Sequence, residues 1–375
     1  SNIVALNIDC PLLTKVNYLG TVASWNNIKF NDVSSNPMYL VYQNCFYKNN
    51  VQTLQMSWID SIGTTLTLPK VSIIKKYTFI NLSYLNKVIV PANINEFEED
   101  CFKITDDRDC PATGGNYIGV ERYATDELLA KSGYFIRQNQ LTSVEYESTI
   151  ENWAHITFGS KYSTPMSLAK FENGDRSTTP IADLKANGNS IRNLDGTSLI
   201  EVKDYAFYCV GKLELFTHSS ALKTIGKYAF SRTGLKSVSL SSSVENIGEG
   251  CFAYNQNLTA VNISSALKKI SIHTFIKYKT KQTTAGIETF DITINGTTSD
   301  FNQISLDSNY FGFLNSSFPT ITTDGITTLQ SDMIIRFRLK TNGDNDFKNM
   351  CSDTELKEDK KGFVNCLTGN TGPNA

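Results

Sequence analysis

The chain of 375 residues lacks two features that would assign it to a large functional class. It has no run of 18 apolar residues, which excludes a membrane-spanning helix of ordinary length. Its net charge is only −2, with an isoelectric point near 6.0. This balance leaves no basic surface for nucleic acid or for an anionic membrane. The sequence therefore predicts neither a nucleic-acid partner nor a membrane span, and no secretory signal is visible either.

Residues suited to catalysis and metal binding are also scarce. The three histidines, His155, His218 and His273, have no spacing typical of a catalytic triad or a metal centre. The eight cysteines form no C-x-x-C pair, which removes zinc-ribbon and redox motifs. No G-x-S-x-G, H-E-x-x-H or P-loop motif occurs. The sequence predicts no catalytic residues, no metal and no cofactor.

Two acidic runs are the nearest approach to a cation site. The segment that begins at Asn342 resembles a calcium loop, but Phe347 stands where a glycine is required. Asp353 also replaces the usual glutamate at the twelfth position. The second run comprises Asp106, Asp107 and Asp109. We interpret both runs as solvated loop charge.

The cysteines fall into two groups. The first lies in or beside a repeated core phrase and is interpreted as reduced packing residues, namely Cys45, Cys101, Cys209 and Cys251. The second lies outside that phrase and comprises Cys10, Cys110, Cys351 and Cys366. Cys351 and Cys366 are candidates for a disulfide in the tail, but pairing cannot be deduced from sequence.

What the chain does contain is a regular series of phenylalanines, here called the phenylalanine ladder. Successive members are 22 or 23 residues apart within two groups, and each ends a phrase such as IGKYAF or IGEGCF. A fixed period of this length is typical of a solenoid, in which each repeat buries its apolar side against its neighbours. The ladder consists of Phe79, Phe102, Phe207, Phe230, Phe252 and Phe275.

Each repeat carries two patterns between ladder phenylalanines. The pattern L-x-x-V-x-[LIV] alternates with period 2, which predicts a short strand with one buried face. The pattern I-x-x-x-[A/C]-F has helix-like spacing and is compatible with a turn of helix or a tight loop. Strands of successive coils should lie parallel, about 4.8 Å apart. A small residue before each phenylalanine predicts close contact between coils.

A longer duplication overlies the ladder. The segment around Trp25 resembles that around Trp153, and the offset of 128 residues continues without a gap. Residues 13–102 and 141–230 are therefore two copies of one block, and a third copy begins near Phe301. The tryptophan motif is interpreted as a structural cover of a longer coil, in preference to a ligand-binding tryptophan pocket.

These patterns predict five segments. They are a repeat block at 1–102, an insert at 103–135 with a short helix near 126–132, a second repeat block at 136–295, a degenerate repeat with a C-terminal cap at 296–340, and a polar tail at 341–375. The alternating segment Met333–Leu339 is expected to form a capping strand. For the insert, a specific contact and a tolerated surface excursion both stay open.

The phrases IGKYAF and IGEGCF, with the strands between them, resemble the BspA-like family of leucine-rich repeats (type 5). The resemblance covers residues 13–295 and implies an α/β repeat fold, a right-handed solenoid with a parallel sheet on one face. It also implies adhesion or protein recognition by secreted or surface-anchored proteins. No catalytic or binding residues carry over from the family.

The alternation within the strands then predicts a binding face. Side chains between the buried ones should point outward and form the partner-binding surface. They are Lys87, Ile89, Leu215, Thr217, Ser237, Ser239, Ala260 and Asn262. Exposed Ile89, Leu215 and Ala260 favour a protein partner over a glycan. The leading hypothesis is a non-enzymatic, adhesin-like recognition protein, surface-bound or secreted, whose leader is absent from a chain that begins at Ser1.

Two alternatives belong to other classes. A structural component of a virion or cell envelope would use the solenoid as a spacer, and a stable homo-oligomer would favour it. An enzyme with the repeat as an appended module is disfavoured, because the repeat leaves too little chain for a catalytic domain. The oligomeric state is not indicated by the sequence.

Overall fold

A computed structural model gives the structure of the chain. It describes residues 13, 15–41, 56–61, 63–105, 139–171, 179–270, 274–275, 286–297, 299–300, 303–306, 318–321, 327–330, 333–340, 342, 345–346 and 348–349. The chain divides into two compact units, unit 1 (residues 1–191 and 205–212) and unit 2 (192–204 and 213–375). Within the described part, every helix is too short or too polar to cross a bilayer.

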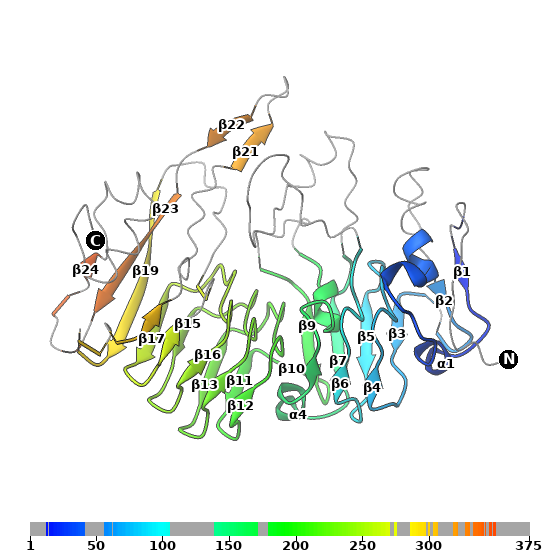
Figure 1. Ribbon diagram of the computed structural model, residues 1–375, viewed down its shortest axis with the longest axis horizontal. Coiled ribbons are helices and arrows are strands. Elements are labelled where there is room, and N and C mark those ends of the chain that lie inside the picture. The colour runs from blue at the N-terminus through cyan, green and yellow to red at the C-terminus, as the bar shows by residue number, and fades with distance from the viewer. Residues whose placement is uncertain are drawn as a thin grey trace. The chain divides into compact units, whose positions relative to one another are not determined.

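The described part of unit 1 is built from short strands and short helices (Figure 1). The elements are β1 (Val16–Asn17), α1 (Val22–Asn26), η1 (Val33–Ser35), β2 (Met56–Ser57), β3 (Thr65–Thr67), β4 (Ile73–Ile74), β5 (Lys87–Val90), β6 (Glu96–Phe97), β7 (Ser143–Tyr146), α4 (Ile150–Ala154), β8 (Thr157–Phe158), η2 (Pro165–Leu168), β9 (Asp183–Ala186) and β10 (Asn189–Ser190). Its wide sheet has the order β10-β9-β7-β5-β3, and all pairs except β9–β10 are parallel.

Unit 2 continues the same pattern of strands. Its elements are β11 (Asn193–Gly196), β12 (Glu201–Val202), β13 (Leu215–His218), β14 (Thr224–Ile225), β15 (Ser237–Ser239), β16 (Asn246–Ile247), β17 (Ala260–Ser264), β18 (Lys269–Ile270), β19 (Gly286–Asn295), β20 (Ser305–Leu306), β21 (Phe318–Ile321), β22 (Thr327–Gln330), β23 (Met333–Lys340) and β24 (Lys348–Asn349). The strands β11 and β13 pair in parallel, and β15, β17, β19 and β23 form a parallel series. The strand predicted at Met333–Leu339 is confirmed as β23, whereas its capping role stays a prediction.

The period-2 pattern explains which side of each strand is buried. In β5, Val88 and Val90 are fully buried, whereas Lys87 and Ile89, which alternate with them, are partly exposed. In β15, Val238 is buried between exposed Ser237 and Ser239. The predicted strands with one buried face are thus confirmed. The alternation works because neighbouring side chains on a strand point to opposite faces.

The phenylalanine ladder forms the core in both units. All six members are at most 2% exposed. In unit 2, the rings of Phe230, Phe252 and Phe275 stack with centroid distances of 5.7 and 6.0 Å. The backbone N–H of Phe230 donates to the carbonyl of Cys251 in the next coil at 2.9 Å. This close approach explains why the residue before each ladder phenylalanine is small and buried.

In the five coils where the structure describes it, the return phrase before the ladder phenylalanine is a tight turn and not a helix. The residue two positions before the ladder phenylalanine has a positive φ in five coils, between 50° and 61°. These residues are Tyr77, Asp100, Tyr205, Tyr228 and Gly250. A left-handed residue ends helical geometry at that point. The helix-like spacing therefore reflected a turn, which was one of the two structures that the pattern allowed.

The duplication of 128 residues appears in the geometry of both copies. Trp25 and Trp153 lie at equivalent positions in α1 and α4, which begin after Thr21 and Thr149 as N-caps. The register Val16↔Met56 between β1 and β2 corresponds to Val144↔Leu184 between β7 and β9. Likewise, Leu66↔Val88 between β3 and β5 corresponds to Leu194↔Phe216 between β11 and β13.

A short hairpin interrupts the parallel pairing in each copy. In the second copy, Asn187 and Gly188 have φ of 47° and 78°, and β9 turns back into antiparallel β10. In the first copy, the antiparallel bridge Trp58↔Ser61 occupies the equivalent place. The dipeptide Asn187-Gly188 is a strong sequence signal for a hairpin. This signal identifies an interruption of the sheet that the repeat period alone did not predict.

Several predictions fall outside the described residues. They concern the helix near 126–132, the acidic run at 106–109, His273, most of the tail, and Cys10, Cys45, Cys110, Cys351 and Cys366. The division into five segments stays a prediction.

Candidate functional site

The outward side chains of the wide sheet in unit 1 form two rows across its parallel strands. The first row follows the register Thr65, Lys87, Ser143 and Asp183, of which Asp183 is buried. The second row follows Thr67, Ile89, Glu145 and Lys185. The predicted residues Lys87 and Ile89 therefore belong to this face. Ile89 is only partly exposed, because Thr67 and Glu145 flank it. The prediction of a well-exposed apolar side chain at this position is therefore corrected.

Charged side chains of both signs join the strands of this face. Glu145 lies between Lys87 at 2.6 Å and Lys185 at 3.6 Å, and all three side chains are about one-third exposed. Its hydrogen bond with Lys87 lowers the pKa of the Glu145 carboxyl below its ordinary value, and Lys185 adds to this shift. In the first row, the carboxylate of Asp183 accepts from Ser190 Oγ at 2.7 Å, and its Oδ2 lies 3.7 Å from Lys212 Nζ. The unit 1 face is thus a network of paired charges.

Replacing Glu145 by glutamine should lower the free energy of unfolding by about 0.5–1 kcal/mol at pH 7. A carboxyl group whose pKa is lowered by folding stabilises the protein above its unfolded pKa and loses that effect as pH falls. The difference between the wild type and Glu145→Gln should therefore shrink below about pH 4.3. Urea unfolding at pH 7 and pH 3 measures it.

Exposed Glu147 provides the matched control for that measurement. Glu147→Gln should leave the unfolding free energy nearly unchanged at both pH values. Equal losses for the two variants would contradict a specific role for the pairs with Lys87 and Lys185.

The outward side chains of unit 2 are smaller and mostly uncharged. The register of β11 with β13 aligns Asn193 with Leu215 and Asp195 with Thr217. The register of β15, β17 and β19 aligns one row of Ser237, Ala260 and Asp291 and a second row of Ser239, Asn262 and Thr293. All six predicted residues on β13, β15 and β17 lie here. Leu215 is 45% exposed, whereas Ala260 is only partly exposed. The expected exposed apolar set is therefore reduced to Leu215.

The eight predicted residues are divided between the two units: Lys87 and Ile89 belong to unit 1 and the other six to unit 2. Sequence reasoning missed outward neighbours on β7, β9 and β11, namely Ser143, Glu145, Lys185, Asn193 and Asp195. The offset of 128 residues would have found β11, since it makes Asn193 and Asp195 the equivalents of Thr65 and Thr67 in the first copy. The strand β9 required the register seen in the structure.

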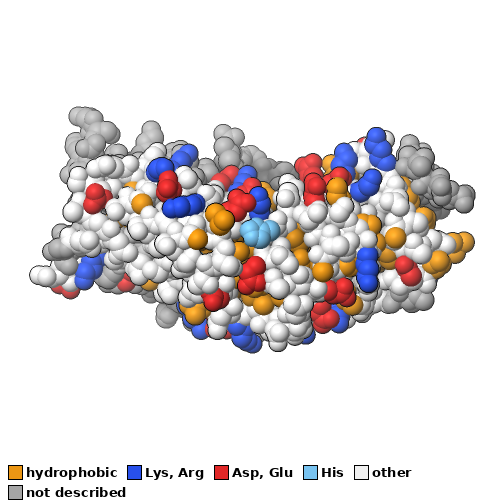
Figure 2. Space-filling model, turned by 90° about the horizontal axis from the view of Figure 1, so that it is seen from below, with side chains coloured by type: hydrophobic (Ala, Val, Ile, Leu, Met, Phe, Trp, Pro, Cys, Tyr) orange, Lys and Arg blue, Asp and Glu red, His pale blue; other side chains and the backbone are white. Residues whose placement is uncertain are grey.

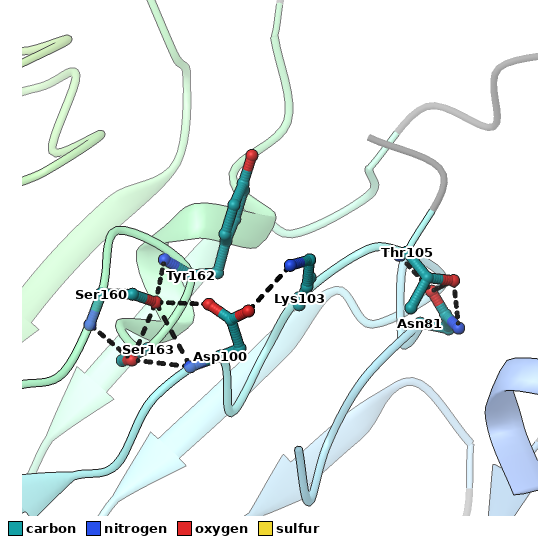
Figure 3. A network of polar contacts seen from close by, with 7 residues as sticks. All are labelled: Asn81, Asp100, Lys103, Thr105, Ser160, Tyr162 and Ser163. Atoms are coloured by element: carbon teal, nitrogen blue, oxygen red, sulfur yellow. Dashed lines mark hydrogen bonds and ion pairs between the residues drawn. The ribbon is translucent and has the colours of Figure 1, made fainter. Parts of the chain in front are cut away.

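A polar network joins the last coil of the first copy to the start of the second (Figure 3). The carboxylate of Asp100 accepts from Ser160 Oγ at 2.7 Å and pairs with Lys103 Nζ at 2.8 Å. The backbone N–H of Asp100 lies 3.1 Å from Ser163 Oγ. Because the lysine pairs with the carboxylate and no histidine is among these residues, the network resembles no triad. Its role is to fasten the two copies together.

The tryptophan motif is structural in both copies. Trp153 is fully buried, and its Nε1 donates to the carbonyl of Ala206 at 2.6 Å. Trp25 is 1% exposed and donates to the carbonyl of Thr78 at 2.8 Å. Each ring therefore ties its helix to the return turn of a later coil. The buried position of both rings contradicts a ligand-binding tryptophan pocket.

The remaining candidates for chemistry have structural partners. His155 is exposed at the C-cap of α4, and His218 is partly exposed with a backbone carbonyl near each ring nitrogen. Cys101, Cys209 and Cys251 are buried and are not joined in disulfides, and burial raises the pKa of the Cys101 and Cys251 thiols. Among the described residues, no group of three His, Cys, Asp or Glu side chains is placed to hold a metal.

Figure 2 shows one face of the molecule, with acidic, basic and hydrophobic side chains interspersed among neutral polar surface. No large area of a single charge is present on the part of this face that the structure describes. The distribution agrees with the near-neutral composition and with the paired charges of unit 1.

Parallel strands linked by tight return turns, with a stacked phenylalanine core, define a leucine-rich repeat protein. A family model described as "BspA type Leucine rich repeat region" matches residues 21–107 and 187–304 with six copies of the repeat. The chain therefore belongs to the BspA type leucine-rich repeat family, as the resemblance of its phrases predicted.

Two solved structures are similar to this chain. One is a leucine rich cell surface protein from Faecalibacterium prausnitzii A2-165, with 12% identity, a TM-score of 0.30 and coverage of 67% of each chain. The other is a leucine-rich repeat protein from Bacteroides ovatus ATCC 8483, with 16% identity and a TM-score of 0.24. That match covers 65% of this chain and 72% of the other. A search of curated proteins gave no match.

Proposed function

We propose that this chain is a non-catalytic recognition protein, at the cell surface or secreted, that binds a protein partner through the outward side chains of its parallel strands. The observation that carries the proposal is the registered rows on both units, which present side chains at fixed strand spacing. Leucine-rich repeat proteins generally mediate protein interactions, and membership of the family supports the same reading. A rigid array of this kind binds with little loss of side-chain order.

Leu215 favours a protein over a glycan as the partner. It is 45% exposed on β13, beside small polar side chains that a partner can approach closely. Burial of a leucine side chain in an interface stabilises the complex by about 1.5–3 kcal/mol at most. The hydroxyl and amide side chains around it, such as Thr217 and Asn262, also suit a glycan, which keeps that partner as the second candidate.

The first test replaces the apolar residues of the two faces by glutamate. Leu215→Glu and Ile89→Glu together should abolish partner binding, because each places an unpaired charge inside the interface. Binding is measured by surface plasmon resonance against a panel of purified cell-surface and matrix proteins, and in parallel on a glycan array. Binding to the protein panel alone supports the protein partner, and binding to the array alone supports the glycan.

The matched control replaces apolar residues that lie off these faces. Ile200 is 64% exposed before β12, and Ile73 is 36% exposed on β4. Ile200→Glu and Ile73→Glu should retain full binding. If the Leu215 and Ile89 variants also retain it, the sheet faces are not the binding surface and the insert at 103–135 becomes the candidate.

A structural role is the alternative function. A virion or cell-envelope component would use the repeats as a spacer and would form a stable homo-oligomer, whereas a recognition protein needs none. Light scattering at micromolar concentration separates the two. The comparisons lend no support to the virion variant.

We further propose the finer features of the architecture: a right-handed solenoid, an insert at 103–135, and a cap at 296–340 followed by a polar tail. Connections between parallel strands are right-handed in nearly all proteins. Support for the insert comes from its two flanks, because Thr105 N donates to Asn81 Oδ1 and Gln140 N donates to Ser83 O. Support for the cap comes from β24, which pairs antiparallel with β23.

A further inference from the structure

The strands β13 and β15 of unit 2 belong to successive coils and lie side by side, but they are members of different sheets. Elsewhere, adjacent strands share a backbone bond at one recurring position. Between β3 and β5, the backbone N–H of Leu68 donates to the carbonyl of Ile89 at 2.9 Å. Between β15 and β17, the backbone N–H of Leu240 donates to the carbonyl of Asn262 at 2.8 Å. The equivalent pair between β13 and β15 is His218 N and Ser239 O.

At this place the imidazole of His218 lies against the carbonyl of Ser239. Its Nε2 lies 3.1 Å from the carbonyl oxygen of Ser239, and its Nδ1 lies 2.9 Å from the carbonyl oxygen of Ser219. The backbone N–H of Ser241 also lies 3.4 Å from Nε2, so this nitrogen donates to the Ser239 carbonyl in one tautomer and accepts from Ser241 N–H in the other. The ring also stacks on Phe216, with a centroid distance of 5.4 Å and an angle of 28°. These contacts hold it between the two strands.

The duplication shows that the fold does not need a histidine here. The equivalent residue in the first copy is Val90, which is fully buried and belongs to a strand that pairs normally with β7. The neighbouring coils of unit 2 have Leu240 and Ile263 at the same position, and both are buried. An aliphatic side chain therefore fits this site, and the histidine is a difference between two otherwise similar copies.

We infer that His218 is a positioning residue that separates β13 from β15 and links them through its side chain. This link sets the spacing between the outward pair Leu215 and Thr217 and the outward pair Ser237 and Ser239. The consequence for binding rests on the proposed function, whereas the strand spacing does not. Removal of the ring should let His218's backbone N–H reach Ser239 O, as it does in the other coils.

The test is residue-resolved amide hydrogen exchange on the full chain, comparing the wild type with His218→Val. The valine is taken from the first copy, and the amide of residue 218 should then exchange at least about tenfold more slowly. Unchanged exchange at residue 218 would overturn the inference. It would mean that the separation of β13 from β15 is caused by the backbone of the coil and not by the ring of His218. If His218→Val does not fold, His218→Leu, taken from position 240, serves in its place.

Two further measurements keep strand spacing and binding distinct. A crystal structure of the wild type should show Nε2 of His218 within hydrogen-bond distance of Ser239 O; a direct backbone bond from His218 N to Ser239 O would overturn the inference. For a partner found with the panel above, His218→Val should change the Kd at least fivefold at an unchanged melting temperature. An unchanged Kd with slowed exchange at residue 218 would reject the role in binding and leave the role in spacing.

Discussion

Replacing Phe230 by alanine should lower the free energy of unfolding by about 3–5 kcal/mol. Phe230 is fully buried, and the centroid of its ring lies 4.6 Å from that of Phe216 and 5.7 Å from that of Phe252. Alanine leaves a cavity inside a column of rings whose neighbours are fixed by their own coils. Unfolding in guanidinium chloride, followed by tryptophan fluorescence and circular dichroism, measures the loss.

The half-exposed Leu215 on the same coil is the control for this substitution. Leu215→Ala leaves no cavity, because much of the side chain already faces solvent, and should cost less than about 1 kcal/mol. A melting temperature of Phe230→Ala near that of the wild type would show that the phenylalanine ladder is not the core.

The second large effect concerns the tryptophan of the second copy. Trp153→Ala should lower the free energy of unfolding by about 3–5 kcal/mol, because it removes a fully buried ring packed against Tyr146 and Phe158. Trp153→Phe keeps much of this packing but removes the bond from Nε1 to the carbonyl of Ala206. The carbonyl then loses its side-chain donor, at a cost of about 1–3 kcal/mol.

The first copy provides a matched comparison for this hydrogen bond. The carbonyl of Thr78 accepts from Trp25 Nε1 and also from Asn36 Nδ2 at 3.2 Å. The residue equivalent to Asn36 in the second copy is Thr164, whose hydroxyl instead accepts from the backbone N–H of Met166. Trp25→Phe should therefore cost less than Trp153→Phe. A larger loss for Trp25→Phe in the same denaturant titration would contradict this account.

Much of the fold followed from local patterns. The alternation around Val88 and Val238 predicted strands and their buried faces, because side-chain direction on a strand depends only on position. The offset between Trp25 and Trp153 predicted two equivalent segments, and in the structure these similar sequences form the same capped helical turn. The tight return turns were one of two options, because a short I-x-x-x-[A/C]-F phrase does not distinguish a helical turn from a loop.

The candidate site was less accessible from the sequence. Leu215 was correctly placed on an outward face, but Ile89 and Ala260 are partly covered, because exposure depends on the side chains of the adjacent strands. The partners of Lys87 could not be predicted, since Glu145 reaches it only through the register of β5 and β7, which lie far apart in the sequence. The division of the outward residues between the two units could not be predicted either, because the repeat period is the same in both.

The sequence by itself determined the repeat, its buried positions and the two copies, because these depend on residue type at a fixed spacing along one chain. Only the tertiary structure decided how coils meet: the charge pairs around Glu145, the hairpin at Asn187-Gly188 that interrupts the sheet, and the imidazole of His218 between β13 and β15. The physical reason is that a contact between coils depends on register and on which strands are neighbours. Neither is encoded by the period that makes every coil alike.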